Sequence, residues 1–490
     1  MAVARNGQAI ALADVPRLDG VALAASVGDA LDEGQRLAAL FALDDAEAPE
    51  VFALIAADAR GTLRWLRAVL PERRYPAITP RHPSAQGFER ELFEQFAIVP
   101  EGHPWLKPLR RHSDLEGDPS RAHPFFAVAG AGVHEVAVGP VHAGIIEPGH
   151  FRFQCHGEEV LSLEIQLGYQ HRGAERLIER SAPARRMVVA ESIAGDTVIG
   201  HATAHAMVIE ALGGADVPLR AEALRAVALE LERLANHVGD LGGLCTDVAY
   251  LPGAAYFGRI RGEFLNLLLE LSGNRYGRGL VRAGGVRFDV GDDMAVRFRA
   301  RLERAARELQ DTAALALRTP SVESRFEKTG VVSPAVAEEL GLVGPVARAS
   351  GSTRDVRQDH AHGFYRYAHI PVTTLETGDV MARAMVRLLE AERSLDFLDQ
   401  ELARLPAGEV HEPAPAPRAA ALTAALVEGW RGEIVHAAVT GERGEIRRYK
   451  VVDPSFHNWF GLAIALRGNQ ISDFPLCNKS FNLSYAGHDL

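Results

Sequence analysis

This 490-residue sequence contains few cysteines. There are three, Cys155, Cys245 and Cys477, and they lie far apart along the chain. Three scattered cysteines cannot build the disulfide framework of a small secreted protein. We therefore expect a protein that works in a reducing compartment.

Basic segments and long apolar runs are also missing. Lys and Arg total 53 against 64 Asp and Glu, and the net charge of −11 argues against nucleic-acid binding, because phosphates are bound by clustered cations. Residues 1–40 contain no basic segment followed by an apolar run, so we expect no secretory signal. No apolar run approaches the roughly 20 residues that span a bilayer. At a membrane, the chain would be held by other subunits.

What the sequence does have is the composition of a large globular protein. It is 47% hydrophobic and 24% charged, and its length suits two or three domains. A turn-rich stretch with Asp114, Gly117, Asp118 and Pro119 predicts a linker. No Gly-x-Gly-x-x-Gly motif follows a predicted strand, so we do not expect this chain to bind a nicotinamide cofactor itself.

Residue periodicity predicts both strands and helices. Alternating side chains predict a half-buried strand over 160–167, and a further strand is predicted over 133–141. Apolar residues recur at steps of three and four over 224–241 and over 381–402, which predicts two long helices. Asp379 is a plausible N-cap of the second helix.

Two segments resemble known subunits, in the order expected of a fusion. The first, residues 75–109, contains Glu89-Arg90-Glu91, then Phe96 and Gly102-His103-Pro104. It resembles the signature of the 30-kilodalton-type subunit of complex I and its counterpart in formate hydrogenlyase-type hydrogenases. Without the family, the same residues predict a charged amphipathic helix that runs into a Gly-Pro turn.

The second segment covers roughly residues 138–490. It resembles the 49-kilodalton-type subunit of complex I and the large subunit of group 4 [NiFe] hydrogenases, of the formate hydrogenlyase and hydrogenase-4 type. The matching elements stand in the same order in both families. They are residues 139–142 (GPVH), 147–153 (EPGHFRF), 167–173 (LGYQHRG), 230–237 (ELERLANH), 282–286 (RAGGV), 349–351 (ASG), 355–357 (DVR) and 377–379 (TGD).

The resemblance implies an α+β fold in three parts. Residues 1–115 correspond to a small α/β domain of the 30-kilodalton type, and residues 116–137 to a linker. Residues 138–490 correspond to a mainly helical domain that opens with a β-hairpin and carries a small C-terminal β segment.

The resemblance also locates a metal site that has lost its ligands. Hydrogenases hold nickel and iron with two Cys-x-x-Cys pairs, because soft thiolates suit these metals. In this sequence the early pair corresponds to Ala194 and Thr197, and the late pair to Ser484 and Gly487. His201 remains in register with the histidine that follows the early pair. We therefore expect no nickel-iron centre, as in hydrogenase-related members without these cysteines.

Other residues match positions near the hydrogenase site. Arg431 resembles an arginine aimed at the metal, although a surface arginine on a strand is an equal alternative. Glu147 matches a family carboxylate, and a solvated turn glutamate is equally plausible. His201 and His205 have a two-ligand spacing on a helix, but no third ligand accompanies them, so a structural role is favoured.

Complex I suggests a quinone site in place of the metal. The related subunit uses a histidine in the opening hairpin and a tyrosine near the former cysteine pair, which can stabilise and protonate a reduced quinone. His150 matches the histidine. Gly195 stands at the tyrosine position, and the neighbouring Asp196 offers a proton donor or relay. We therefore expect His150, Asp196 and Arg431 to act on the acceptor, with Glu147 and His201 lining the cavity.

The resemblance implies partners and leaves the role of the chain open. It predicts a peripheral subunit on the cytoplasmic side of a membrane, beside a small iron-sulfur subunit with a 4Fe-4S cluster. A ferredoxin-like iron-sulfur subunit and antiporter-like membrane subunits are also implied. The chain would be either a redox subunit with a quinone or other acceptor cavity, or a non-catalytic coupling subunit. An active hydrogenase is the remote alternative.

Overall fold

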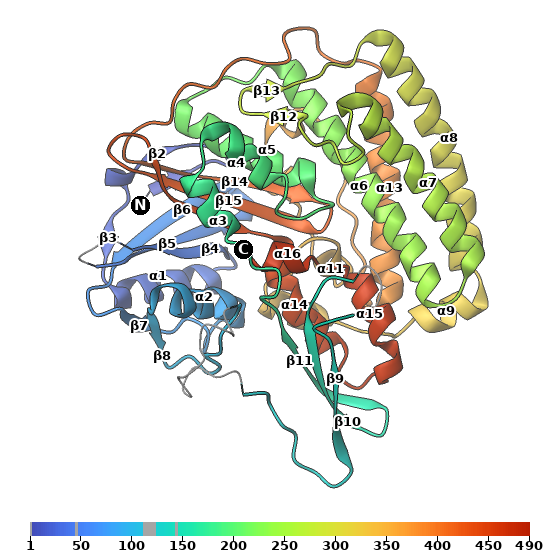
Figure 1. Cartoon of the computed structure of the whole chain (residues 1–490), viewed down its shortest axis with the longest axis horizontal. Coiled ribbons are helices and arrows are strands. Elements are labelled where there is room, and N and C mark those ends of the chain that lie inside the picture. Colours follow the sequence, from blue (N-terminus) through green and yellow to red (C-terminus); the bar gives the residue numbers. More distant parts are fainter. Residues whose placement is uncertain (1, 45–47, 111–123, 143–145) are drawn as a thin grey trace.

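The N-terminal part of the chain folds around one sheet. In the computed structural model, which describes residues 2–44, 48–110, 124–142 and 146–490, the sheet order is β1-β6-β5-β4 and the neighbours are antiparallel (Figure 1). β3 pairs in parallel with β6. The strands are β1 (Ala2–Ala4), β3 (Arg17–Leu18), β4 (Arg36–Leu43), β5 (Glu50–Ala57) and β6 (Thr62–Val69). Helices α1 (Gly20–Asp32) and α2 (Gln86–Phe96) pack against it, with the short pair β7 (Arg74–Pro76) and β8 (Val99–Glu101) beside them.

A second sheet lies between the first sheet and helix α5 (Val198–Gly213). Its order is β16-β15-β14-β2, formed by β14 (Ala421–Gly429), β15 (Gly432–Thr440), β16 (Ile446–Val452) and the N-terminal β2 (Ile10–Ala11). Leu422 and Leu426 of β14 pack into the N-terminal core, whereas Ala421 and Ala425 face the opposite cluster. Both faces of β14 are therefore buried, which explains its nearly continuous apolar sequence.

The predicted long helices form a bundle on the other side of the molecule (Figure 1). The helix expected over 224–241 is α6 (Leu219–Asp247), and that expected over 381–402 is α13 (Val380–Leu402). The Asp379 side chain accepts a hydrogen bond from the Ala382 N–H, which confirms the predicted N-cap. The bundle is completed by α7 (Leu251–Ser272), α8 (Asp292–Leu317) and α9 (Pro320–Phe326). Three short helices follow along the chain, α10 (Pro334–Glu339), α11 (Gly344–Arg348) and α12 (Val356–Asp359). The short strands β12 (Val281–Arg282) and β13 (Gly285–Val286) form a pair between α7 and α8 in the sequence.

The two predicted strands belong to a three-stranded antiparallel sheet. Its order is β11-β10-β9, with β9 (Val133–Val138), β10 (His150–His156) and β11 (Glu159–Gln166). Helices α3 (Ala174–Arg180) and α4 (Pro183–Ala190) follow before α5. The chain ends with α14 (Pro454–Ala465), α15 (Phe474–Phe481) and α16 (Tyr485–His488), and its last eight residues are all buried.

The expected α+β fold is confirmed. The boundaries at 115 and 138 stay predictions, since Asp114, Gly117, Asp118 and Pro119 lie outside the described residues, and residues 133–137 of the predicted linker belong to β9. Among the described residues, no helix is long and apolar enough to cross a membrane.

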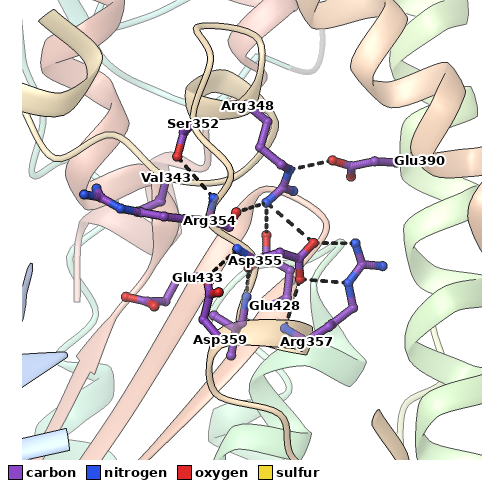
Figure 2. A network of polar contacts seen from close by, with 12 residues as sticks. Val343, Arg348, Ser352, Arg354, Asp355, Arg357, Asp359, Glu390, Glu428 and Glu433 are labelled. Atoms are coloured by element: carbon purple, nitrogen blue, oxygen red, sulfur yellow. Dashed lines mark hydrogen bonds and ion pairs between the residues drawn. The ribbon is translucent and has the colours of Figure 1, made fainter. Parts of the chain in front are cut away.

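A buried ionic network joins the bundle to the second sheet (Figure 2). Arg348, at the end of α11, donates to Glu390 of α13 at 2.7 Å and to Glu428 of β14 at 2.8 Å. Arg357 pairs with Asp355 at 2.6 Å. These side chains are nearly inaccessible to solvent. Burial raises the pKa of Glu428 to about 7, although Arg348 opposes the shift.

Replacing Arg348 with methionine tests how much this network contributes to the stability of the fold. Arg348→Met leaves Glu390 and Glu428 buried without their shared cation, so we expect the free energy of unfolding to fall by about 3–5 kcal/mol. Urea denaturation of the chain measures it. Arg307→Met is the matched control, because Arg307 forms an exposed pair with Glu303 and should cost about 0.5 kcal/mol. Equal losses in the two variants would show that the network contributes little.

Candidate functional site

An arginine–aspartate pair marks the centre of the candidate site. Arg431 lies in the two-residue turn between β14 and β15, and Asp196 lies just before α5. The guanidinium donates two parallel hydrogen bonds to the carboxylate, Nη1 to Oδ1 at 2.6 Å and Nη2 to Oδ2 at 2.8 Å. The side chain of Asp196 is 33% exposed and that of Arg431 is 5% exposed. The pair is thus accessible from the Asp196 side.

Three further contacts hold Arg431 in place. Its Nε donates to the Asn482 carbonyl oxygen at 2.6 Å, and its Nη1 donates to Thr197 Oγ1 at 3.1 Å. The guanidinium also lies 3.9 Å from the Trp430 ring centroid. Because Asn482 precedes α16, Arg431 connects the start of α5 with the C-terminal segment.

Asp196 rests as a carboxylate. Burial tends to raise its pKa, but the Arg431 guanidinium outweighs burial and holds the pKa below its ordinary value. An ionised aspartate accepts a proton before it can donate one. Asp196 therefore fits the relay role of the sequence hypothesis better than that of a resting donor.

Glu147 belongs to the same electrostatic cluster. Its Oε2 accepts the Tyr485 N–H at 3.3 Å. Burial raises the pKa of Glu147 above its ordinary value, while Arg431 pulls it down and Asp196 pushes it up. A side chain built on Gly195 would meet nothing within 4 Å, so the surface beside Asp196 has open space.

Of the four positions matched to metal ligands, Ala194 and Thr197 stand on either side of Asp196 in the chain, and Ser484 and Gly487 belong to the C-terminal segment. Ala194 is buried, and Thr197 Oγ1 accepts the Trp430 indole N–H at 3.0 Å. Ser484 caps α16, its Oγ accepting the Gly487 N–H at 2.8 Å. Ala194 and Gly487 have no side-chain donor atom, and both hydroxyls are already engaged.

Asp453, which the sequence did not single out, occupies the space beside Gly487. A Cβ on Gly487 would lie 2.6–2.8 Å from the Asp453 carboxyl atoms. Asp453 caps α14 through the Ser455 N–H at 2.8 Å, and its Oδ2 lies 3.1 Å from His201 Nε2. Burial raises the pKa of Asp453, but the His201 contact reverses the shift, so the group is ionised. The only local signal was an Asp-Pro helix start.

His150 lies apart from the Asp196–Arg431 pair. Its Nδ1 donates to the Gly139 carbonyl oxygen at 3.1 Å, and its Nε2 accepts from Arg152 Nε at 3.2 Å. Within the described residues, no hydrogen bond or ion pair joins His150 to Asp196 or Arg431. The structure thus brings together Glu147, Asp196 and Arg431, with His201 linked through Asp453, and it holds His150 at the start of β10.

The predicted helix spacing of His201 and His205 is confirmed, but both rings bond to side chains. His201 contacts Asp453 and His436, and His205 Nδ1 lies 2.8 Å from Tyr449 Oη. Cys477 is buried, and burial raises the pKa of its thiol to about 11. Over the described part of the chain, no group of three or more His, Cys, Asp or Glu side chains is placed to hold a metal ion.

Comparison with known families matches both segments. Residues 15–124 match the family described as respiratory-chain NADH dehydrogenase, 30 Kd subunit. Residues 247–423 match the family described as respiratory-chain NADH dehydrogenase, 49 Kd subunit. Among solved structures, a chain of the membrane-bound sulfane sulfur reductase, an archaeal respiratory membrane complex, is similar with a TM-score of 0.68 and 25% identity, over 73% of this chain and 98% of that one.

Curated relatives match over most of their length. Formate hydrogenlyase subunit 5 of Escherichia coli is 32% identical over 88% of this chain and 80% of its own. Hydrogenase-4 component G of the same organism is 30% identical over 85% and 76%. NADH-quinone oxidoreductase subunit 4 of Thermus thermophilus is 31% identical over 69% and 89%. The chain therefore belongs to the complex I-type family that includes formate hydrogenlyase subunit 5 and hydrogenase-4 component G, with domains of the 30- and 49-kilodalton types fused in one chain.

Proposed function

We propose that this chain is the redox subunit of a membrane-bound, complex I-like oxidoreductase, and that the surface around Asp196 and Arg431 receives a quinone or another acceptor. The observation that carries the proposal is the twofold hydrogen-bonded Asp196–Arg431 pair, one side of which is exposed. By the sequence resemblance, Asp196 stands between the two positions, Ala194 and Thr197, that match the early cysteine pair of the hydrogenases. Electron transfer there is coupled to ion translocation by the rest of the complex.

The residues present suit the reduction of a carbonyl acceptor. A guanidinium fixed by several contacts stabilises negative charge that develops on a reduced oxygen. Asp196 is positioned to take up and pass on a proton, and Glu147, with its raised pKa, is a second proton-holding group. His150 supplies a further imidazole at the opening sheet, as the complex I resemblance suggests.

The same residues do not fit a thiolate-held nickel-iron centre. Ala194 and Gly487 offer no ligand atom, the hydroxyls of Thr197 and Ser484 are poor ligands for soft metals, and the Asp453 carboxylate fills the space beside Gly487. We therefore derive no hydrogenase step.

The proposed partners follow from the family. A small iron-sulfur subunit with a 4Fe-4S cluster would deliver electrons to the Asp196 side, assisted by a ferredoxin-like subunit. Antiporter-like membrane subunits would hold the chain on the cytoplasmic side of the membrane. The relatives that support this are subunits of membrane-bound hydrogenase and NADH-quinone oxidoreductase complexes.

A non-catalytic coupling subunit is the second candidate. The observation that favours it is the rigid ionic network in Figure 2, which connects α13, α11 and β14 through buried contacts and could transmit a displacement as a unit. In this case the Asp196–Arg431 pair would serve only to join elements.

Asp196→Asn separates these two candidates. Removing the charge weakens the pair with Arg431 and abolishes proton uptake at this carboxyl, so we expect quinone reduction by the purified complex to fall about 10-fold or more. The assay uses titanium(III) citrate as electron donor and a short-chain quinone, with subunit content verified. Asp311→Asn, on the exposed face of α8, is the control. Unchanged turnover in an intact Asp196→Asn complex supports the coupling role.

His150→Ala tests the second proposed group. By the complex I resemblance the imidazole would bind the quinone, so its loss should raise KM for the quinone or lower turnover several-fold. The same assay with a sulfane sulfur acceptor in place of the quinone determines whether the effect is confined to one acceptor. Wild-type kinetics with both acceptors would remove His150 from the site.

Metal analysis of the purified complex tests the assignment of the ligand positions. We expect iron from the iron-sulfur partners and no stoichiometric nickel, because the residues described above provide no thiolate set. Inductively coupled plasma mass spectrometry measures both metals. One nickel per complex would overturn the proposal and restore hydrogenase activity as a candidate.

A further inference from the structure

Five buried side chains form a continuous hydrogen-bonded row behind the candidate site. Asp453 Oδ2 lies 3.1 Å from His201 Nε2, and His201 Nδ1 lies 3.0 Å from His436 Nε2. His436 Nδ1 and His205 Nδ1 each lie 2.8 Å from Tyr449 Oη. The row therefore runs Asp453–His201–His436–Tyr449–His205. It crosses from α14 to α5, β15 and β16, and returns to α5.

The row is buried, and burial keeps His205, His436 and Tyr449 neutral. None of its members is more than 2% exposed. Burial lowers the pKa of His205 to about 3, lowers that of His436 well below its ordinary value, and raises that of Tyr449. Asp453 is ionised, because the His201 contact lowers its pKa.

The protons of the row can be arranged so that every hydrogen bond is made and all of them point from His205 toward Asp453. Ionised Asp453 only accepts, so His201 Nε2 donates to it and His201 Nδ1 accepts from His436 Nε2. His436 Nδ1 then accepts from the Tyr449 hydroxyl. Tyr449 oxygen in turn accepts from His205 Nδ1. Each of the four donors gives one proton, and His205 Nε2 is left with a free lone pair.

One added proton produces the opposite arrangement and preserves every hydrogen bond of the row. A proton bound at His205 Nε2 releases the Nδ1 proton to Tyr449, which passes its own to His436 Nδ1. His436 gives its Nε2 proton to His201, which becomes an imidazolium paired with Asp453. One proton has entered and one positive charge has arrived at the other end. Such rows conduct protons because each bond is remade as the neighbouring one is broken.

We propose that this row is a proton wire that supplies the candidate acceptor site. Its inner end, Asp453, lies against Gly487, within electrostatic reach of Asp196 and Arg431. Its outer end, His205, lies beneath α4, where the partly exposed Arg186 is the charged group that acts on it. Glu175 of α3 and Arg186 act on Tyr449. Use of the delivered proton rests on the proposed function.

A purely structural role explains the row poorly. Burying three imidazoles, a phenol and a carboxylate costs desolvation that apolar side chains of similar size would avoid. The surrounding cluster is in fact apolar, with Val208, Ala425, Ala438 and Val451 beside Tyr449. In addition, the ring nitrogens that face along the row contact other titratable side chains and not the backbone.

Tyr449→Phe breaks the wire with almost no change in shape. We expect quinone reduction by the intact complex to fall about 10-fold or more and to show a larger solvent deuterium isotope effect, because proton delivery becomes rate-limiting. Reduction of the iron-sulfur partners, followed by electron paramagnetic resonance, should not change. If Tyr449→Phe fails to assemble, His205→Gln removes the outer end instead. Thr203→Val on α5, whose buried hydroxyl has no hydrogen-bond partner among the described residues, is the control.

The outcomes distinguish the wire from the acceptor site. One outcome is that Tyr449→Phe or His205→Gln keeps the wild-type rate of quinone reduction and the wild-type isotope effect, while Asp196→Asn is impaired. This result would overturn the proton wire and leave the proposed function standing. If Tyr449→Phe lowers quinone reduction and Asp196→Asn does not, the proton wire is supported and the acceptor must bind at a site other than the one around Asp196. An equal loss in Thr203→Val would show that the effect is structural and overturn the wire.

Histidine tautomers give a readout that needs no turnover. Both proton arrangements require one, and only one, of His205 and His436 to carry a proton on Nδ1, since Tyr449 has a single hydroxyl proton. Solid-state nitrogen-15 NMR of the histidine-labelled complex measures this, with Tyr449→Phe as the spectrum in which the constraint is lost. Wild-type spectra in which neither or both carry the Nδ1 proton would overturn the proposal.

Discussion

The structure depends on the placement of three buried charges at the tip of the β14–β15 hairpin. Glu428 joins Arg348, Arg431 joins Asp196, and Glu433 accepts two hydrogen bonds from Arg36 of β4 at 2.8 Å. The six residues from Glu428 to Glu433, which are the two-residue turn and the adjoining strand ends, therefore connect the helical bundle, the start of α5 and the N-terminal sheet. Because a buried charge that loses its partner costs several kcal/mol, this hairpin constrains all three parts together.

Close backbone contact holds the hairpin tip in position. A Cβ on Gly344 would lie 2.1 Å from the Arg431 carbonyl oxygen, and one on Gly432 would lie 2.8 Å from Gly344 Cα. Glycine at both positions lets α11 reach the turn, which brings Arg348 to Glu428. The indole of Trp430 packs on the other side and donates to Thr197 Oγ1. The candidate site and the ionic network thus share the β14–β15 hairpin as their support.

Side-chain contacts also connect the start of α5 with the C-terminal segment. Here Arg431 makes that connection by contacting Asp196 and the Asn482 carbonyl oxygen. Asp453 makes a second connection, since it contacts His201 of α5 and lies against Gly487. Hydrogen bonds that involve charged groups are stronger than those between neutral groups, so both connections stabilise this part of the fold.

Much of the fold and part of the site were predictable from local patterns. Periodicity identified α6 and α13, and Asp379 was a recognisable cap because its partner, Ala382, is three residues away. Ordered motifs identified the family and pointed to Asp196, Arg431 and His201. Asp453, His436 and Tyr449 were not predictable, because each gains its role from a residue on another element. His201 and Asp453 are 252 positions apart.

By itself, the sequence determined the element types, the family and the absence of cysteine at positions 194, 197, 484 and 487, because these follow from residue identity and short-range spacing. Only the tertiary structure decided which charges meet. It paired Asp196 with Arg431, held His150 apart from them, and aligned His201 and His205 with side chains from β15, β16 and α14. Such pairings depend on the packing of sheets and helices at ångström precision, which residue spacing along a chain does not encode.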